Sequence, residues 1–192
     1  MTQTMESPVR QIAGRAVPTA GRWQIDGAHT SVEFVARHLM VTKVRGAFAD
    51  VSGTIEVGDD PLESRVTVAL QTDSITTGDE SRDAHLRSQD FFDVERHPEM
   101  TFTSTKVRAD GDAWILDGDL TIKGVTRPVS LDVAFLGTVE DPWGNTKAAF
   151  SATTEIERED WGLTWNVALD SGGLLVSKKI SIEIELQASP MA

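Results

Sequence analysis

The segment of residues 79–93 gathers charged side chains that could bind the polar part of a ligand. Arg82 and His85 both lie on the short polar helix that this segment is expected to form. Arginine binds phosphate and carbonyl oxygens, and histidine changes its charge near neutral pH. One hypothesis is therefore that Arg82 and His85 lie near a ligand head group at the mouth of a cavity. The alternative is that this segment only plugs one end of a β-barrel.

His38 is the residue that an enzymatic interpretation requires. It ends a run whose apolar residues share one face, so it is either a hydrogen-bonded structural residue or a ligand contact. A small-lipid isomerase or hydrolase would need His38 to meet Asp83 or Asp26 within ~3 Å inside a cavity. The chain has four histidines, but no two have the spacing of a helical metal pair, and no nucleophile elbow or phosphate-binding glycine motif occurs. We expect no catalytic residue, no metal and no cofactor.

Arg158 lies close in sequence to Trp161 and Trp165. Its guanidinium could bind a phosphate or quinone oxygen. The alternative is an ion pair with a neighbouring acid, which is the commoner arrangement for a surface arginine. Arg158 and Trp161 are included among the candidate ligand contacts.

The elements that must position these residues are β-strands. From Thr30 onward apolar residues recur at every second position, which is typical of strands with one buried face. About eight such segments follow one another through short polar turns, without βαβ alternation. Between residues 44 and 57 the apolar parity changes, which predicts a one-residue slip near residues 50–53, with a β-bulge at Gly53. The sequence predicts an all-β, eight-stranded up-and-down antiparallel barrel with a short helix over about residues 79–90 at one end.

The predicted helix has a clear start and a clear end. Asp79 or Ser81 can cap its N-terminus by accepting a backbone hydrogen bond. Phe91 and Phe92 follow it as a consecutive aromatic pair. We expect these rings to insert into the apolar interior and the charged side chains of the helix to face solvent.

The inward-facing positions combine aromatic residues with unusually small ones. The small residues include Ala36, Gly46, Gly118, Ala152 and Thr154. A barrel of eight strands needs bulky side chains to reach normal packing density, so small residues leave room for a ligand. The alternative is that the phenylalanine rings interlock and fill the barrel, which would favour an interaction module. In the cavity interpretation, the apolar ligand contacts are Phe34, Phe48, Leu70, Phe91, Phe102, Leu120, Leu131 and Phe150.

Several motifs resemble those of the YceI-like family. The most specific is the run R-D-A-H-L-R-S-Q-D-F-F-D at residues 82–93, followed by H-P-E-M-T-F at residues 97–102. Residues 23–34, 44–48, 118–126 and 156–165 also match motifs of that family in the same order, so the resemblance spans about residues 23–187. It implies a lipocalin-like antiparallel barrel that encloses a long apolar ligand, typically a polyisoprenoid.

The composition limits the classes of partner. The net charge of −12 argues against nucleic acid, because phosphate contacts need clustered basic residues. No apolar run approaches the ~20 residues that cross a bilayer, so we expect no stable membrane insertion. Because the chain contains no cysteine, disulfides and thiolate chemistry are excluded.

Residues 1–21 lack a continuous apolar stretch, so they do not have the pattern of a secretory signal. We interpret them as a disordered tail and residues 22–188 as one lipid-binding barrel domain, and we expect a cytoplasmic protein. The family that the chain resembles commonly forms dimers, so a homodimer is expected as an option, with Trp143 as an interface candidate.

The leading hypothesis is non-enzymatic binding, storage or transport of an isoprenoid-tailed lipid in the barrel. The ligand would be a polyprenyl phosphate or pyrophosphate, or an isoprenoid quinone. Burial of apolar area would drive binding, and polar groups would fix the orientation.

Overall fold

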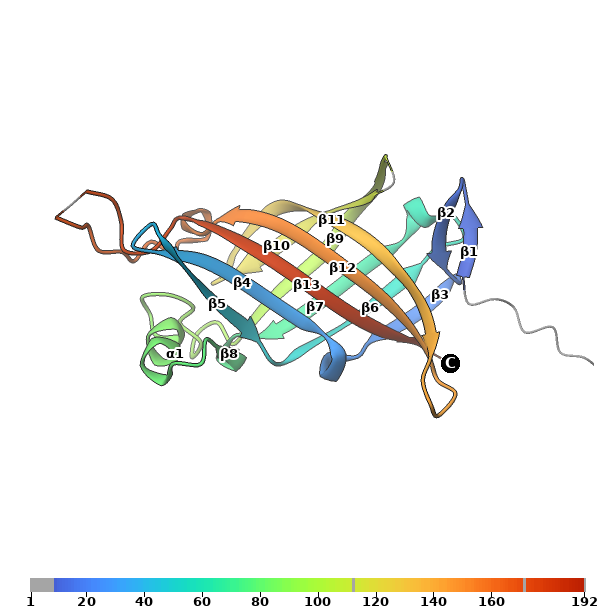
Figure 1. Cartoon of the computed structure of the whole chain (residues 1–192), viewed down its shortest axis with the longest axis horizontal. Helices are drawn as coiled ribbons and strands as arrows, with labels where there is room; N and C mark the ends of the chain where they lie inside the picture. Colours follow the sequence, from blue (N-terminus) through green and yellow to red (C-terminus); the bar gives the residue numbers. More distant parts are fainter. Residues whose placement is uncertain (1–8, 112, 171, 192) are drawn as a thin grey trace, which may run out of the picture.

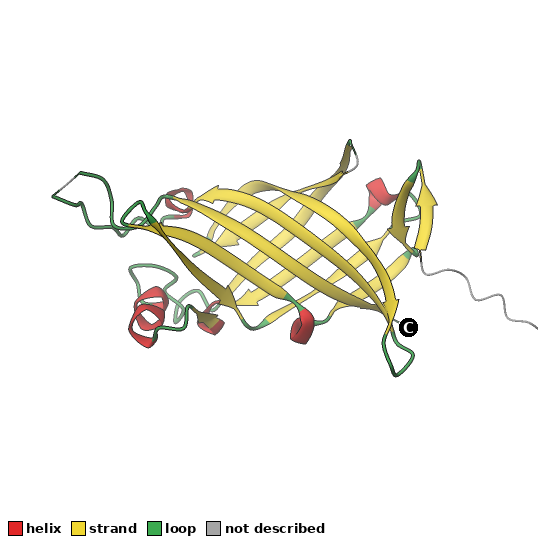
Figure 2. Ribbon diagram, viewed as in Figure 1, coloured by secondary structure: helices red, strands yellow, loops and turns green. Residues whose placement is uncertain are grey.

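The computed structural model describes residues 9–111, 113–170 and 172–191, and most of them form β-strands (Figure 2). The strands are β1 (Val9–Ile12), β2 (Arg15–Pro18), β3 (Gly21–Ile25), β4 (Ser31–His38), β5 (Thr42–Phe48), β6 (Val51–Val57), β7 (Arg65–Gln71), β8 (Ile75–Thr76), β9 (Glu99–Asp110), β10 (Ala113–Ile122), β11 (Val125–Glu140), β12 (Thr146–Glu157) and β13 (Lys179–Pro190). The helices are α1 (Glu80–Arg87) and the short 3-10 turns η1 (Gly27–His29), η2 (Pro61–Glu63), η3 (Thr72–Ser74) and η4 (Arg158–Trp161).

The strands close into an eight-stranded antiparallel barrel, as predicted. Strand β13 pairs with β12 over residues 179–188 on one side, and on its other side with β4 and then β3. Strands β3 and β4 therefore act as two halves of one bent strand. The same holds for β5 with β6 and for β7 with β8, because β4 pairs with β5, β3 with β6, and β6 with β7. Counted this way, neighbours in the chain are neighbours in the barrel.

The three bent strands break at adjacent places and form a crease in the wall. The breaks are η1, the step at Ala49 and Asp50, and η3. Gly27 lies so close to the carbonyl oxygen of Val51 that a Cβ atom would collide with it, so the crease needs glycine there. The predicted bulge at Gly53 is wrong: β6 pairs with β7 without a register shift, and the change of parity occurs at the step between β5 and β6.

Helix α1 and the β1–β2 hairpin cover opposite ends of the barrel (Figure 1). Asp79 caps α1 by accepting a hydrogen bond from the Arg82 amide at 2.8 Å, and the predicted helix is confirmed with a shorter C-terminal end, at Arg87. Phe91 is buried and Phe92 packs against the core, as expected. Asp83 is the exception to the solvent-facing charges of α1, because its side chain is buried.

The β1–β2 hairpin corrects the expectation that residues 1–21 form a disordered tail. Residues 9–18 pair antiparallel through a two-residue turn, in which Ala13 and Gly14 have positive φ angles of 51° and 79°. Val17 is 3 % exposed, because the hairpin packs against the barrel. Sequence periodicity could not reveal this hairpin, since each of its strands has only four residues. Residues 1–8 lie outside the described residues, so the expectation for them stays a prediction.

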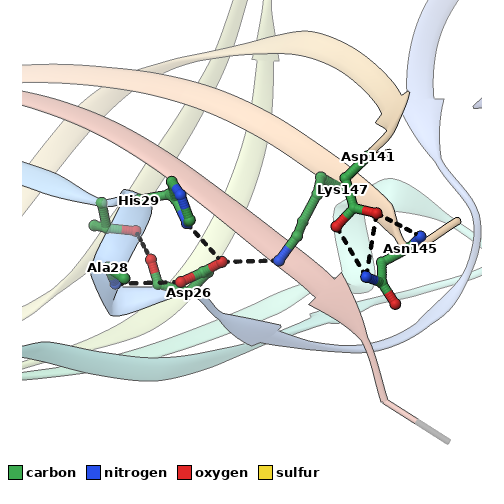
Figure 3. A network of polar contacts seen from close by, with 7 residues as sticks. Asp26, Ala28, His29, Asp141, Asn145 and Lys147 are labelled. Carbon is green, nitrogen blue, oxygen red and sulfur yellow. Dashed lines mark hydrogen bonds and ion pairs between the residues drawn. The ribbon is translucent and has the colours of Figure 1, made fainter. Parts of the chain in front are cut away.

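A group of polar contacts joins the crease to β12, and a separate group shapes the β11–β12 turn (Figure 3). Lys147 donates a hydrogen bond to Asp26 at 2.8 Å, and His29 lies 3.0 Å from the same carboxylate. Lys147 and His29 together lower the pKa of Asp26 to about 2, against the cost of burial. Asp141 accepts hydrogen bonds from Asn145 and from the Trp143 amide, which shapes the turn. Within the described ranges, no helix has the length and hydropathy needed to cross a bilayer.

Candidate functional site

The barrel encloses a cavity of about 320 Å³ whose lining is almost wholly apolar. It is about twice the size of the ~150 Å³ engineered cavity that stays dry and binds benzene. The space is therefore too large to be a packing imperfection, and the described side chains do not fill the barrel completely. This volume lies at the lower end of the range of small-molecule sites, ~300–1,000 Å³.

Nine of the thirteen predicted contact residues line this cavity: Phe34, Phe48, Leu70, Phe91, Phe102, Leu120, Leu131, Phe150 and Arg158. They come from seven strands, from η4 and from the segment after α1. For the seven residues on strands, the inward direction follows from the period of two along each strand, which is why the sequence could identify them. Whether they contact a ligand stays a prediction.

Small residues contribute to the hollow in a different way from the one expected. Ala36, Ala152 and Thr154 line the cavity. Gly46 and Gly118 instead make room for neighbouring rings, because a Cβ atom on either glycine would collide with Phe34 or Phe102. These two glycines let aromatic rings lie flat against the wall, so the rings narrow the barrel without closing it.

The ends of the cavity have different covers. At one end Leu86, Phe91 and Phe92 lie over the opening, and Phe92 meets the Phe48 ring edge-on with centroids 5.6 Å apart. At the other end Val17 and Pro18 of the β1–β2 hairpin complete the lining. Sequence reasoning missed Val17 and Pro18, because a four-residue strand carries too little periodicity to be recognised.

Four predicted contacts lie outside the lining: His38, Arg82, His85 and Trp161. Arg82 donates to the hydroxyl of Thr77 at 2.7 Å. His85 packs edge-on against the rings of Phe91 and Trp165, with its Nε2 atom 2.9 Å from Asp90. These side chains hold the α1 cover in place, which is closer to the plug interpretation than to a ligand contact.

Trp161 and His38 also have structural environments. Trp161 is 3 % exposed, and its indole nitrogen donates to the backbone oxygen of Leu120 at 3.0 Å. It therefore lies behind the lining and supports it. His38 ends β4, where it bridges to Val176 and pairs with Thr42.

Asp83 is a buried carboxylate that fixes the connection into α1. Burial raises its pKa, but hydrogen bonds from the hydroxyl and the amide of Thr77 outweigh that effect and leave the pKa below its usual value. The hydroxyl of Thr77 lies 2.6 Å from Oδ1 and the amide lies 2.8 Å from it. Asp83 therefore holds the Thr77 amide and the hydroxyl groups of Thr76 and Thr77.

The pairing that an enzymatic mechanism needs is not found among the described residues. None of their hydrogen bonds joins His38 to Asp83 or Asp26. Two other histidine–aspartate contacts exist, His29 with Asp26 at 3.0 Å and His85 with Asp90 at 2.9 Å. Neither histidine lines the cavity, so both pairs lie away from the space where a lipid would react.

Arg158 is the basic residue of the cavity lining. It is 5 % exposed, and its guanidinium carbon lies 5.9 Å from the centre of the Phe91 ring. Its Nε atom donates to the backbone oxygen of Ser177 at 3.0 Å, and its Nη1 atom donates to that of Leu163. The ion pair expected with a neighbouring acid does not form, because Glu159 is 2.9 Å from Lys178 instead.

The comparisons with known proteins agree with this architecture. A family model described as the YceI-like domain matches residues 23–188. A UPF0312 protein of Pectobacterium atrosepticum is 40 % identical over 153 residues, which are 79 % of this chain and 80 % of that protein. The crystal structure of Burkholderia cenocepacia BcnA superposes with a TM-score of 0.72 at 21 % identity, covering 85 % of this chain and 98 % of the other.

A third comparison concerns a protein described by what it binds. The structure of a polyisoprenoid binding domain from Saccharophagus degradans, implicated in plant cell wall breakdown, matches with a TM-score of 0.64. It is 17 % identical, and the match covers 88 % of this chain and 98 % of that one. At this identity the likeness concerns the fold. The family model and the relative from Pectobacterium show that the chain belongs to the family of YceI-like domains.

Proposed function

We propose that this protein binds an isoprenoid-tailed lipid in the barrel cavity and carries or stores it without chemical change. The observation that carries the proposal is the enclosed apolar cavity of about 320 Å³ with a single basic residue, Arg158, in its described lining. The polyisoprenoid-binding description of the Saccharophagus degradans neighbour supports the same class of ligand.

The physical basis is the transfer of hydrocarbon out of water. Each buried CH₂ group contributes about 0.8 kcal/mol, so a few isoprene units supply enough to offset the ~4–15 kcal/mol cost of association. The lining offers few hydrogen-bonding groups, so the affinity must come mainly from the tail. The proposed head groups are a phosphate, a pyrophosphate or a quinone.

The non-enzymatic role is supported by the residues around the cavity. Among the lining residues that the structure describes, the charged ones are Glu33 and Arg158. Glu33 lies 3.8 Å from Arg45, and its side chain is 42 % exposed, so it is placed toward solvent. A general base and its partner are therefore not assembled in the described part of the lining.

Native mass spectrometry of the full chain, prepared without detergent, tests the proposal. Prenyl alcohols of rising length, from geraniol to geranylgeraniol, are offered together with unbranched alcohols of equal carbon number. We expect one bound prenyl alcohol per chain, an affinity that rises with length, and a preference for the branched series. Absence of uptake of every prenyl alcohol would overturn the proposal. Recovery of chemically altered alcohol after long incubation would favour the enzymatic alternative.

Carriage between membranes is a further part of the proposal. Its test is the transfer of a fluorescent prenyl lipid from donor to acceptor vesicles, with a rate that should rise in proportion to protein concentration.

The homodimer and the cytoplasmic location stay predictions. Trp143 is 82 % exposed on the β11–β12 turn. Sedimentation of the wild type and a Trp143→Ser variant by analytical ultracentrifugation would test whether Trp143 contributes to a dimer.

A further inference from the structure

Arg158 has hydrogen-bonding capacity that the protein does not use. A guanidinium carries five N–H donors. The Nε and Nη1 atoms are engaged by backbone oxygens of Ser177 and Leu163. The Nη2 atom is buried and has no hydrogen-bond partner among the described residues. Buried donors without a partner are rare and costly, so this one indicates a missing acceptor.

The charge of Arg158 is also not compensated. The nearest acid in sequence, Glu159, lies 2.9 Å from Lys178. Burial lowers the pKa of Arg158, and Glu159 only partly opposes this effect. Arginine nevertheless stays protonated in proteins, so the residue carries a buried positive charge against an apolar space.

We infer that Arg158 anchors the polar end of the ligand by donating from Nη2 to one oxygen acceptor that carries at most one negative charge. Such an acceptor is a carboxylate or the carbonyl of a quinone. This inference rests on the proposed function: of the proposed head groups it keeps the quinone and disfavours the pyrophosphate, and it adds a carboxylate. The polar end then lies at the α1 end of the cavity beside Phe91, and the tail runs toward Val17 and Pro18.

The same geometry disfavours a pyrophosphate in the cavity. A diphosphate brings two or more negative charges, and one arginine can neutralise one of them. Other basic side chains at this end are already bonded elsewhere: Arg87 to the backbone oxygen of Ile75, and Arg127 to that of Asp160. An uncompensated buried charge is strongly unfavourable, so a diphosphate would have to stay in solvent.

The test uses four probes that share one geranylgeranyl tail and differ only in the head. They are geranylgeranoic acid, geranylgeraniol, geranylgeranyl diphosphate and the naphthoquinone with the same tail, each titrated against the full chain at pH 8. We expect the wild-type protein to bind the acid at least about tenfold more tightly than the alcohol, as a hydrogen bond to a charged group supplies. The diphosphate should bind more weakly than the acid.

The Arg158→Met variant should bind the alcohol as the wild type does and lose the preference for the acid. Arg127→Met is the matched control, because it removes a nearby cation that does not line the cavity, and it should keep the preference. Arg158 also supports two backbone oxygens, so folding of the variant is checked by circular dichroism, and Arg158→Lys retains the charge. The affinities of the wild-type protein for the four probes test the anchor even if Arg158→Met fails to fold.

The outcomes separate the anchor from the cavity. Equal affinity of the wild type for acid and alcohol, or tightest binding of the diphosphate, would overturn the anchor and leave the proposed function standing. Failure of the wild-type protein to bind any of the four probes would overturn the proposed function itself. A preference for the quinone over the alcohol, lost in Arg158→Met, would support the anchor with the carbonyl as its acceptor.

Discussion

The ammonium nitrogen of Lys147 lies 2.8 Å from Oδ2 of Asp26, and this contact ties β12 to the crease between β3 and β4 (Figure 3). The two side chains are 18 % and 21 % exposed, so solvent screens the pair only in part. The crease interrupts three adjacent strands, and the regular strand pairing gives way there to single backbone hydrogen bonds, such as that from the Asp26 amide to Gln187 at 2.8 Å. The ion pair therefore stabilises the barrel wall at the place where the strands are interrupted.

Replacement of Lys147 by methionine should lower the free energy of unfolding by about 1 kcal/mol at pH 7. Lys147 is the largest cause of the lowered pKa of Asp26, about 2 against the ordinary 3.8. Because the folded-state pKa is the lower one, the stabilisation is fully present above pH 3.8 and is lost as the pH falls toward 2. Urea unfolding of both proteins between pH 2 and 7 measures it. A difference that does not shrink on acidification would contradict this account.

Gly118→Ala should destabilise the barrel by about 1–3 kcal/mol, the usual cost of overpacking. The new Cβ atom would meet the Phe102 ring and would lie 2.7 Å from the backbone oxygen of Thr103. Thermal and urea unfolding measure the loss. Gly78→Ala is a control for the loss of glycine itself, because a Cβ atom on Gly78, unlike one on Gly118, would meet no neighbouring atom, although the positive φ of 77° at Gly78 adds backbone strain. Adding Phe102→Leu should restore part of the stability of Gly118→Ala, and additive effects would argue against the ring as the cause.

The overall fold could be predicted from the sequence because the strands are long and alternate regularly. Leu116, Leu120 and Ile122 share a parity and all line the cavity. The turn between β10 and β11 is a two-residue hairpin loop, in which Lys123 and Gly124 have positive φ angles of 50° and 75°. A strand that bends at a crease defeats the same reasoning, as the step between Phe48 and Val51 shows, because parity alone does not distinguish a bulge from a break.

The polar part of the site was harder to predict. Arg82, His85 and Arg158 are all charged residues near aromatic ones in the sequence, yet the structure buries only Arg158 in the cavity wall. Which arginine side chain becomes buried depends on contacts between segments that are distant in the sequence, here those of Arg158 with Ser177 and Phe91. Local sequence does not contain that information.

Ala152→Leu should weaken binding of geranylgeraniol at least about tenfold, because the larger side chain occupies space needed by the tail. Ala152 lines the cavity between Val133 and Ile184 of the neighbouring strands. Filling an apolar hollow adds contacts, so the melting temperature should not fall. The adjacent Thr153→Leu, on the exposed face of β12, is the control and should leave binding unchanged. If Ala152→Leu binds geranylgeraniol with the affinity of the wild type, the tail does not occupy this part of the barrel.

The β1–β2 hairpin should control how fast a bound lipid leaves. It lies outside the residues matched by the family model, and it closes the end of the cavity opposite α1 (Figure 1). Arg10 fastens it, donating to the backbone oxygens of Gly58 at 2.8 Å and Asp59 at 3.2 Å, and to that of Pro18 at 3.1 Å. Without these bonds the hairpin should detach more often and uncover Val17 and Pro18.

Arg10→Met should therefore raise the dissociation rate of a bound prenyl alcohol severalfold in stopped-flow displacement, with a smaller change in barrel stability. Hydrogen exchange offers a ligand-independent readout, since amides of β1 and β2 should exchange faster while those of β12 and β13 keep their protection. Arg22→Met is the control: Arg22 lies at the same end, but its pair with Glu56 at 3.4 Å is exposed and should contribute little. Arg10→Met could speed hydrogen exchange in the hairpin and still release the lipid at the wild-type rate, as Arg22→Met should. In that case the exit path of the lipid lies at the α1 end.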